Sequence, residues 1–157
     1  MLTKKNNLKL IGRREFVDFP LLGVFNIEAK IDTGAYTSSI HCKNISVIKE
    51  NNKQILTFIL ALDDNEVQKT QRFEEFSKKK IKNSFGEKEE RYIIKTLIKI
   101  GSKKIKTTVS LSDRANMRYP VLIGRKLVKG KFLIDVYKIH TGGIPVTDEL
   151  TKLINLK

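Results

Sequence analysis

Hydrophobic residues recur mostly at every second position of the chain, which is the period of β-strands that bury one face. The alternation is regular in segment 25–32, and the residues expected on its buried face are Phe25, Ile27, Ala29 and Ile31. Segments 92–100 and 105–111 alternate in the same way around a Gly-Ser turn, so together they predict a β-hairpin.

Other short apolar runs are bounded by turn residues and predict further strands. These strands cover about 8–12, 13–17, 40–48, 54–62, 120–125 and 132–137. Helical patterning is brief, at about 126–129 and in a terminal turn capped by Thr147. The sequence therefore predicts an all-β domain, closed or sandwich-like, with a short helix near its C-terminal end.

Residues 63–90 form a strongly charged insertion between these strands. Its lysine-rich run 78–82 is followed by Asn-Ser-Phe-Gly, which predicts an exposed ribbon with its bend near Gly86. A basic ribbon with a nearby aromatic residue also fits a nucleic-acid surface. We favour a solvated hairpin over nucleic-acid binding, because charge runs usually cover solvent-exposed faces.

Length and charge narrow the class of protein. The 157 residues predict a single domain, 1–157, with a C-terminal tail at about 141–157. The net charge of +14 predicts an acidic partner, unless it reflects only a compositional bias towards lysine. No apolar run approaches the roughly 20 residues that span a bilayer, so we expect a cytoplasmic protein without a membrane contact. The single Cys42 fits a reducing compartment.

The candidate chemistry lies at the end of segment 25–32, where the strand delivers Asp32 into a turn of small and hydroxylated residues. Gly34 permits backbone angles closed to other residues and leaves space for a ligand beside the carboxylate. The alternative is a plain turn in which the aspartate bonds only its own backbone.

Two distant segments resemble the retropepsin-like aspartic proteases: Asp32-Thr33-Gly34-Ala35, and the later Val121-Leu122-Ile123-Gly124-Arg125. The order of Lys-Ile-Asp-Thr-Gly-Ala, Asn-Ser-Phe-Gly and Met-Arg-Tyr-Pro-Val-Leu-Ile-Gly-Arg is similar to a bacterial family often labelled ATP-dependent zinc protease. That family is associated with ribosomal-protein glutamate ligases. The resemblance covers about residues 10–139.

The resemblance implies a closed retropepsin-like β-barrel with a flap hairpin, and a role for each matching residue. Asp32 is then the catalytic residue, and the residues that support its loop are Thr33, Gly34, Ala35, Gly124 and Arg125. The flap residues are Lys82, Phe85 and Gly86. Tyr36 stands where viral enzymes have an aspartate that pairs with the later arginine. Arg125 therefore needs another partner, such as Asp113, Asp18 or an acidic substrate.

A single Asp-Thr-Gly motif in the chain predicts a homodimer. Hydrolysis without a covalent intermediate needs one carboxylate and one carboxylic acid, and two Asp32 side chains across a twofold axis supply both. The resemblance implies an aspartic peptidase acting on acidic peptides or proteins, including poly-glutamate tails. The alternative is a non-catalytic module that binds an acidic peptide, ribosome or RNA.

We expect neither a metal nor another cofactor, despite the family label. His41, Cys42 and His140 lack the spacing of a zinc site, and neighbours on a strand point to opposite faces. No Gly-rich Gly-Lys-Ser/Thr loop for ATP phosphates is present.

Overall fold

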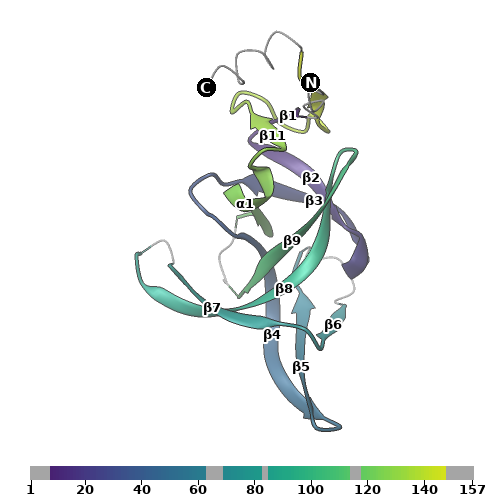
Figure 1. Ribbon diagram of the computed structural model, residues 1–157, viewed down its shortest axis with the longest axis vertical. Helices are drawn as coiled ribbons and strands as arrows, with labels where there is room; N and C mark the ends of the chain where they lie inside the picture. The colour runs from purple at the N-terminus through teal and green to yellow at the C-terminus, as the bar shows by residue number, and fades with distance from the viewer. Residues whose placement is uncertain (1–7, 63–68, 83–84, 114–117, 148–157) are drawn as a thin grey trace, which may run out of the picture.

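Strands make up most of the secondary structure in the computed structural model, which describes residues 8–62, 69–82, 85–113 and 118–147 (Figure 1). The strands are β1 (Lys9–Ile11), β2 (Arg14–Phe19), β3 (Val24–Ile31), β4 (Ser38–Glu50), β5 (Lys53–Leu60), β6 (Thr70–Phe73), β7 (Ser77–Lys82), β8 (Lys88–Ile100), β9 (Lys103–Ser112), β10 (Val121–Ile123), β11 (Phe132–Ile134) and β12 (Ile144–Pro145). Within the described part of the chain, the helical elements are α1 (Arg125–Val128) and the 3-10 turn η1 (Pro20–Leu22). The predicted fold class, mostly β with one short α-helix, is confirmed.

The main sheet is ring-like because β10 pairs with a strand on each side. It runs parallel to β3, with Val121 opposite Ala29, and antiparallel to β4, with Val121 opposite Ile40. The order around the ring is β10, β3, β2, β8, β9 and β4, from which β5, β6 and β7 extend. Figure 1 shows two long arms leaving the ring, the β4–β5 hairpin at the bottom and the β7–β8 hairpin at the left.

The ring encloses the hydrophobic core, and the predicted β8–β9 hairpin supplies much of it. Every second residue of β8 from Ile94 to Ile100 is buried, and the buried Val109 and Ile105 of β9 lie opposite Ile94 and Ile98. Gly101, at φ 58°, makes the connecting turn with a backbone conformation that suits glycine. The sequence alternation therefore identified the inward face of this hairpin.

The predicted inward position of Phe25 is wrong. Phe25 is 57% exposed, whereas Val24 is 6% exposed and joins the core. Asn26 has a φ of 55°, and the pairing of β2 with β3 shifts register between Val17 and Phe19. This irregularity changes which residues face inward at the start of β3, while Ile27, Ala29 and Ile31 are buried as predicted.

Two predicted boundaries also change at the C-terminal end. The last core strand, β11, ends at Ile134 instead of 137, because Asp135 starts a turn in which its Oδ1 accepts the Tyr137 N–H at 3.0 Å. Helix α1 begins at Arg125, one residue earlier than predicted. The terminal helical turn predicted after Thr147 lies outside the described residues.

The buried carboxylate of Glu15 connects the segment before β2 with the segment before β12. Glu15 is 1% exposed, and its carboxylate accepts the N–H of Gly12 at 2.7 Å and of Gly142 at 2.9 Å. It also accepts the N–H and the hydroxyl of Thr141, at 3.1 and 2.9 Å. The segment before β12 is thereby fixed against β2, next to the three-stranded sheet β11-β1-β12 at the top of Figure 1.

In the described part of the chain, no helix has both the length and the apolar character needed to cross a membrane.

Candidate active site

Asp32 follows β3 directly, and backbone hydrogen bonds fix its turn. Its N–H donates to the carbonyl of Ile123 in β10 at 2.8 Å, and its carbonyl accepts the Ala35 N–H at 3.2 Å. Its Oδ1 accepts the Gly34 N–H at 3.0 Å, which is the local bond expected of a plain Asp turn. Asp32 also lines a cavity, so its carboxylate can contact a ligand as well as its own turn.

The junction between β10 and α1 clamps the Asp32 loop from behind. The Arg125 N–H donates to the Ala35 carbonyl at 2.8 Å, and the Lys126 N–H donates to the Tyr36 carbonyl at 3.0 Å. The Gly124 N–H donates to Ser38 Oγ at 3.0 Å. The two segments that carry the family resemblance are therefore in direct contact.

Gly124 is where this clamp is tightest, and replacing it should disturb the site. Its φ of −89° suits any residue, but a Cβ there would lie 2.5 Å from the Tyr36 carbonyl oxygen. Since backbone must move to relieve that contact, we expect Gly124→Ala to cost about 1–3 kcal/mol of stability. Because displacement of the loop would also move Asp32, we expect any catalytic activity that depends on Asp32 to fall by roughly 10²-fold.

The control for that prediction is Gly130→Ala, measured by thermal unfolding and turnover. Gly130 has a φ of 75° but nothing within 4 Å of an added Cβ, so only backbone strain of about 1 kcal/mol is expected. Equal loss of activity in the two variants would contradict the proposed clamp.

Arg125 holds the loop by means other than those predicted. Its Nη1 donates to the Thr33 carbonyl at 2.7 Å, and its guanidinium lies 5.8 Å from the centre of the Tyr36 ring. The predicted partner Asp18 instead accepts the Asn26 N–H at 2.8 Å. Among the described residues, neither Asp18 nor Asp113 pairs with Arg125, so the backbone and Tyr36 replace the missing aspartate.

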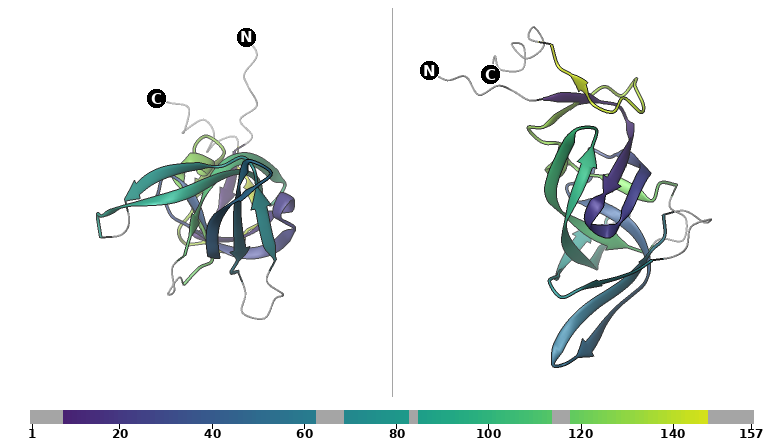
Figure 2. Two further views of the ribbon diagram at one scale, coloured as in Figure 1. Left: turned by 90° about the horizontal axis from the view of Figure 1, so that it is seen from below. Right: turned by 90° about the vertical axis from the view of Figure 1, so that its right-hand side faces the viewer.

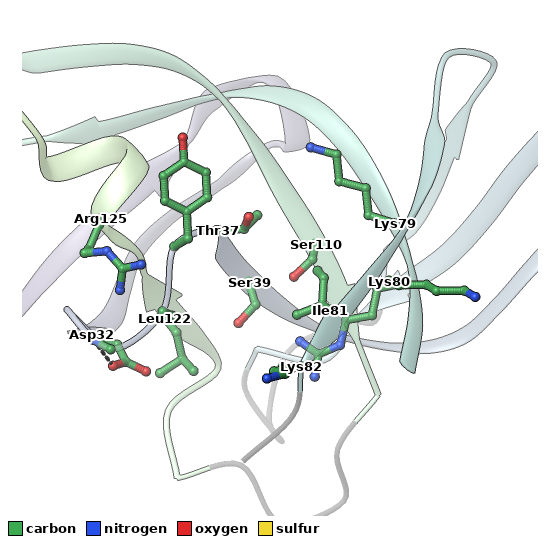
Figure 3. Close-up of a pocket in the computed structure, with 14 residues that line it drawn as sticks. Asp32, Thr37, Ser39, Lys79, Lys80, Ile81, Lys82, Ser110, Leu122 and Arg125 are labelled. Carbon is green, nitrogen blue, oxygen red and sulfur yellow. Dashed lines mark hydrogen bonds between the residues drawn. The ribbon is translucent and has the colours of Figure 1, made fainter. Parts of the chain in front are cut away.

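The cavity in front of Asp32 has a volume of about 560 Å³ (Figure 3). It is lined by Asp32, Gly34, Ala35, Tyr36, Thr37, Ser39, Lys79, Lys80, Ile81, Lys82, Arg91, Ser110, Leu122 and Arg125. Among the described residues of this lining, Asp32 is the single carboxylate, whereas five are cationic. The cavity therefore suits an anionic ligand placed close to one carboxylate.

The β7–β8 hairpin forms the wall opposite the Asp32 loop. It pairs Lys79 with Arg91 and Lys82 with Lys88, and Lys82 reaches the cavity lining. Gly86 has a φ of 80° at the bend, where the sequence placed it. Phe85 is 90% exposed and is not part of the lining. Figure 2 shows the hairpin projecting from the rest of the fold.

Sequence reasoning missed several residues of the cavity, including Thr37, Ser39, Arg91 and Ser110. A usable signal was present, because Ser39 and Ser110 alternate with core residues of their strands and so face away from the core. What the sequence lacked was the pairing of β4 with β9, which sets Ser39 opposite Ser110.

Comparison with known proteins identifies the family. Residues 10–141 match the sequence model of the RimB-like family, described as retropepsin-like aspartic endopeptidase RimB. The chain belongs to the RimB-like family. The predicted resemblance to retropepsin-like proteases is confirmed.

The RimB-like chain is also similar to part of several longer proteins. It is 36% identical over 132 residues to a probable alpha-L-glutamate ligase of Shewanella pealeana, a match that covers 83% of this chain and 29% of the relative. A probable alpha-L-glutamate ligase of Desulfotalea psychrophila is 36% identical over 130 residues, covering 81% of this chain and 28% of the relative. The chain thus spans less than a third of these relatives.

A crystal structure of a Legionella pneumophila protein of unknown function has a similar fold. The two chains are 25% identical and superpose with a TM-score of 0.69, covering 85% of this chain and 98% of the other.

His41, Cys42 and His140, the residues of this RimB-like chain that zinc could prefer, have other surroundings in the structure. His41 Nδ1 lies 3.0 Å from the Ser112 carbonyl, and His140 Nε2 lies 2.6 Å from Glu28. Burial, with a further contribution from Asp113, raises the pKa of the Cys42 thiol far above its usual range, which disfavours the thiolate that a metal needs. The described residues contain no group of three metal-ligating side chains.

Proposed function

We propose that the chain is a homodimeric aspartic peptidase that hydrolyses peptide bonds in acidic peptides, glutamate-rich peptides among them. The observation that carries the proposal is the position of Asp32, the single carboxylate among the described residues that line a cavity rich in cations and hydroxyl groups. Membership of the retropepsin-like family supports the same chemistry.

The need for a second carboxylate supports a dimer. In one chain, Asp32 serves as base or as acid but not as both, and the part of the lining that the structure describes offers no other carboxyl group. Thr33, Gly34 and Tyr36 of the loop are exposed, so a second copy can approach the same surface. An isologous contact would then bring the two Asp32 side chains together across the twofold axis.

The two carboxyl groups would share one proton, because two neighbouring carboxylates resist ionising together. The ionised Asp32 takes a proton from water as the water oxygen bonds to the peptide carbonyl carbon. The protonated Asp32 gives its proton to the carbonyl oxygen, producing a neutral gem-diol. Proton transfer to the peptide nitrogen then accompanies cleavage of the C–N bond.

The charge of the cavity supports an acidic substrate. Lys79, Lys80 and Lys82 are exposed on the cavity wall, where they would attract a negatively charged chain. The relatives named as probable alpha-L-glutamate ligases support glutamate as the acidic residue, because a ligase of that kind would produce such chains.

The test is incubation of the purified protein with oligo-glutamate and oligo-glutamine peptides of equal length, followed by mass spectrometry. We expect cleavage of the glutamate peptide, weakened by salt because screening reduces the attraction. Binding without any cleavage, retained in Asp32→Ala, would contradict the peptidase and favour a non-catalytic module for acidic partners.

A further inference from the structure

A row of residues crosses the cavity floor from the Asp32 side towards the β7–β8 hairpin. Leu122 of β10 lies opposite Ser39 of β4, Ser39 lies opposite Ser110 of β9, and Ser110 lies opposite Ile93 of β8. Paired residues of neighbouring strands share a face of the sheet, so these four side chains face the same side. Two hydroxyl groups therefore lie between two apolar side chains.

Ser39 and Ser110 are buried residues whose hydroxyl groups make few hydrogen bonds to the protein. Ser39 is 5% exposed and Ser110 is 1% exposed. Ser110 Oγ makes only a long bond to the Ser38 carbonyl, at 3.4 Å, and Ser39 Oγ makes none within the described residues. Figure 3 shows both hydroxyl groups at the centre of the cavity. Both hydroxyl groups are therefore free to donate to a polar group of a ligand in the cavity.

Arg91 lies on the same face of β8, two residues before Ile93. It is only 8% exposed, unlike Lys79, Lys80 and Lys82 on the neighbouring strand. Its Nε donates to Glu89 Oε1 at 2.7 Å, and its Nη2 donates to the same oxygen. Its Nη1 makes no hydrogen bond within the described part of the chain.

Glu89 therefore occupies one edge of the guanidinium and leaves the other edge available. The planar guanidinium binds carboxylates through paired N–H groups, and burial holds it in one position. Exposed lysines attract an anion from any direction, whereas a buried arginine binds only an anion whose oxygens match the position and orientation of its N–H groups.

We infer that Arg91, Ser39 and Ser110 form a subsite that binds one side-chain carboxylate of the substrate. The inference rests on the proposed function, in which the same cavity holds the peptide to be cleaved. Arg91 determines specificity through its Nη1 edge, and the two hydroxyl groups complete the set of donors. Glutamine or alanine at that substrate position leaves the Nη1 edge of Arg91 without a charged acceptor.

The experiment measures binding and needs no turnover. Fluorescent peptides with glutamate or glutamine at single positions are titrated against Asp32→Asn protein by anisotropy. At one position, we expect the glutamate peptide to bind about 10- to 100-fold more tightly, the range of a charge-assisted hydrogen-bond pair. Adding Arg91→Gln should remove that preference, and Ser39→Ala with Ser110→Ala should reduce it several-fold.

The matched control is Lys95→Gln, which removes one positive charge from an exposed position of the same strand, outside the cavity lining. It should leave the glutamate preference intact. Equal effects of Arg91→Gln and Lys95→Gln would overturn the inference, since the general positive field would then explain both. If Arg91→Gln does not fold, unchanged preference in the double serine variant overturns it instead.

The inference and the proposed function fail in different ways. Wild-type protein that prefers glutamate at one position but never cleaves refutes the peptidase and retains the subsite. Protein that cleaves peptides with no glutamate preference at any position refutes the subsite alone.

Discussion

Asp32→Asn should lower peptide hydrolysis by at least about 10²–10⁴-fold, the contribution typical of a positioned acid or base. Asparagine keeps the size of the side chain and can still accept the Gly34 N–H, so the loop should retain its structure. The measurement is turnover of the oligo-glutamate peptide, with thermal unfolding as the test of folding. Turnover within threefold of wild type would remove Asp32 from the mechanism.

Mixing the two proteins tests whether the site needs two chains. If subunits exchange, the fraction of dimers that contain two wild-type subunits equals the square of the wild-type fraction. Excess Asp32→Asn protein should therefore place most wild-type subunits in inactive mixed dimers. Activity per wild-type subunit should then fall in proportion to that fraction. Activity that stays constant per wild-type subunit would show that a single chain is sufficient, and the homodimer proposal would fail.

Replacing Glu15 should cause the largest loss of stability. Glu15→Ala removes the acceptor of the buried Gly12 N–H, of two donors on the half-buried Thr141 and of the exposed Gly142 N–H. Because an unsatisfied buried group costs about 1–3 kcal/mol and water can partly replace the acceptor at Thr141 and Gly142, we expect a total near 2–4 kcal/mol, a large share of a domain's stability. Urea unfolding monitored by circular dichroism measures the change.

Glu28→Ala is the matched control for Glu15. Its carboxylate bonds His140, but both side chains are 32% exposed, so we expect a loss within about 1 kcal/mol. Glu15→Gln retains one acceptor oxygen and should be intermediate. A Glu15→Ala variant as stable as Glu28→Ala would contradict the role given to the buried carboxylate.

Much of the fold could be predicted from the sequence, because the alternation of apolar residues and the positions of turn residues are local signals. The β8–β9 hairpin, the Asp32 turn and the short helix after Gly124 were all predictable from such signals. The contact between the Asp32 loop and Gly124 was not local, and its prediction depended on a family resemblance. In the structure, the parallel pairing of Ile123 with Ile31 brings these two segments together.

The remaining features depended on long-range register, which a single sequence does not encode in an obvious way. The inward turn of Val24 in place of Phe25 follows from the backbone of Asn26. The placement of Arg91 and the two serines in one cavity requires the three strands β4, β9 and β8 to be aligned. The charge pattern of the sequence showed that the insertion is basic, but it did not show that Arg91 is buried whereas the lysines are exposed.

The short strand β10 also determines when the site can exist during synthesis. Arg125 reaches back across 92 residues to hold the Thr33 carbonyl, and β10 just before it completes the ring. At about 5–20 residues per second, a ribosome needs roughly 5–20 s to add that stretch after the Asp32 loop. A nascent chain therefore carries the motif without its geometry until the segment that contains β10 and Arg125 has been synthesised.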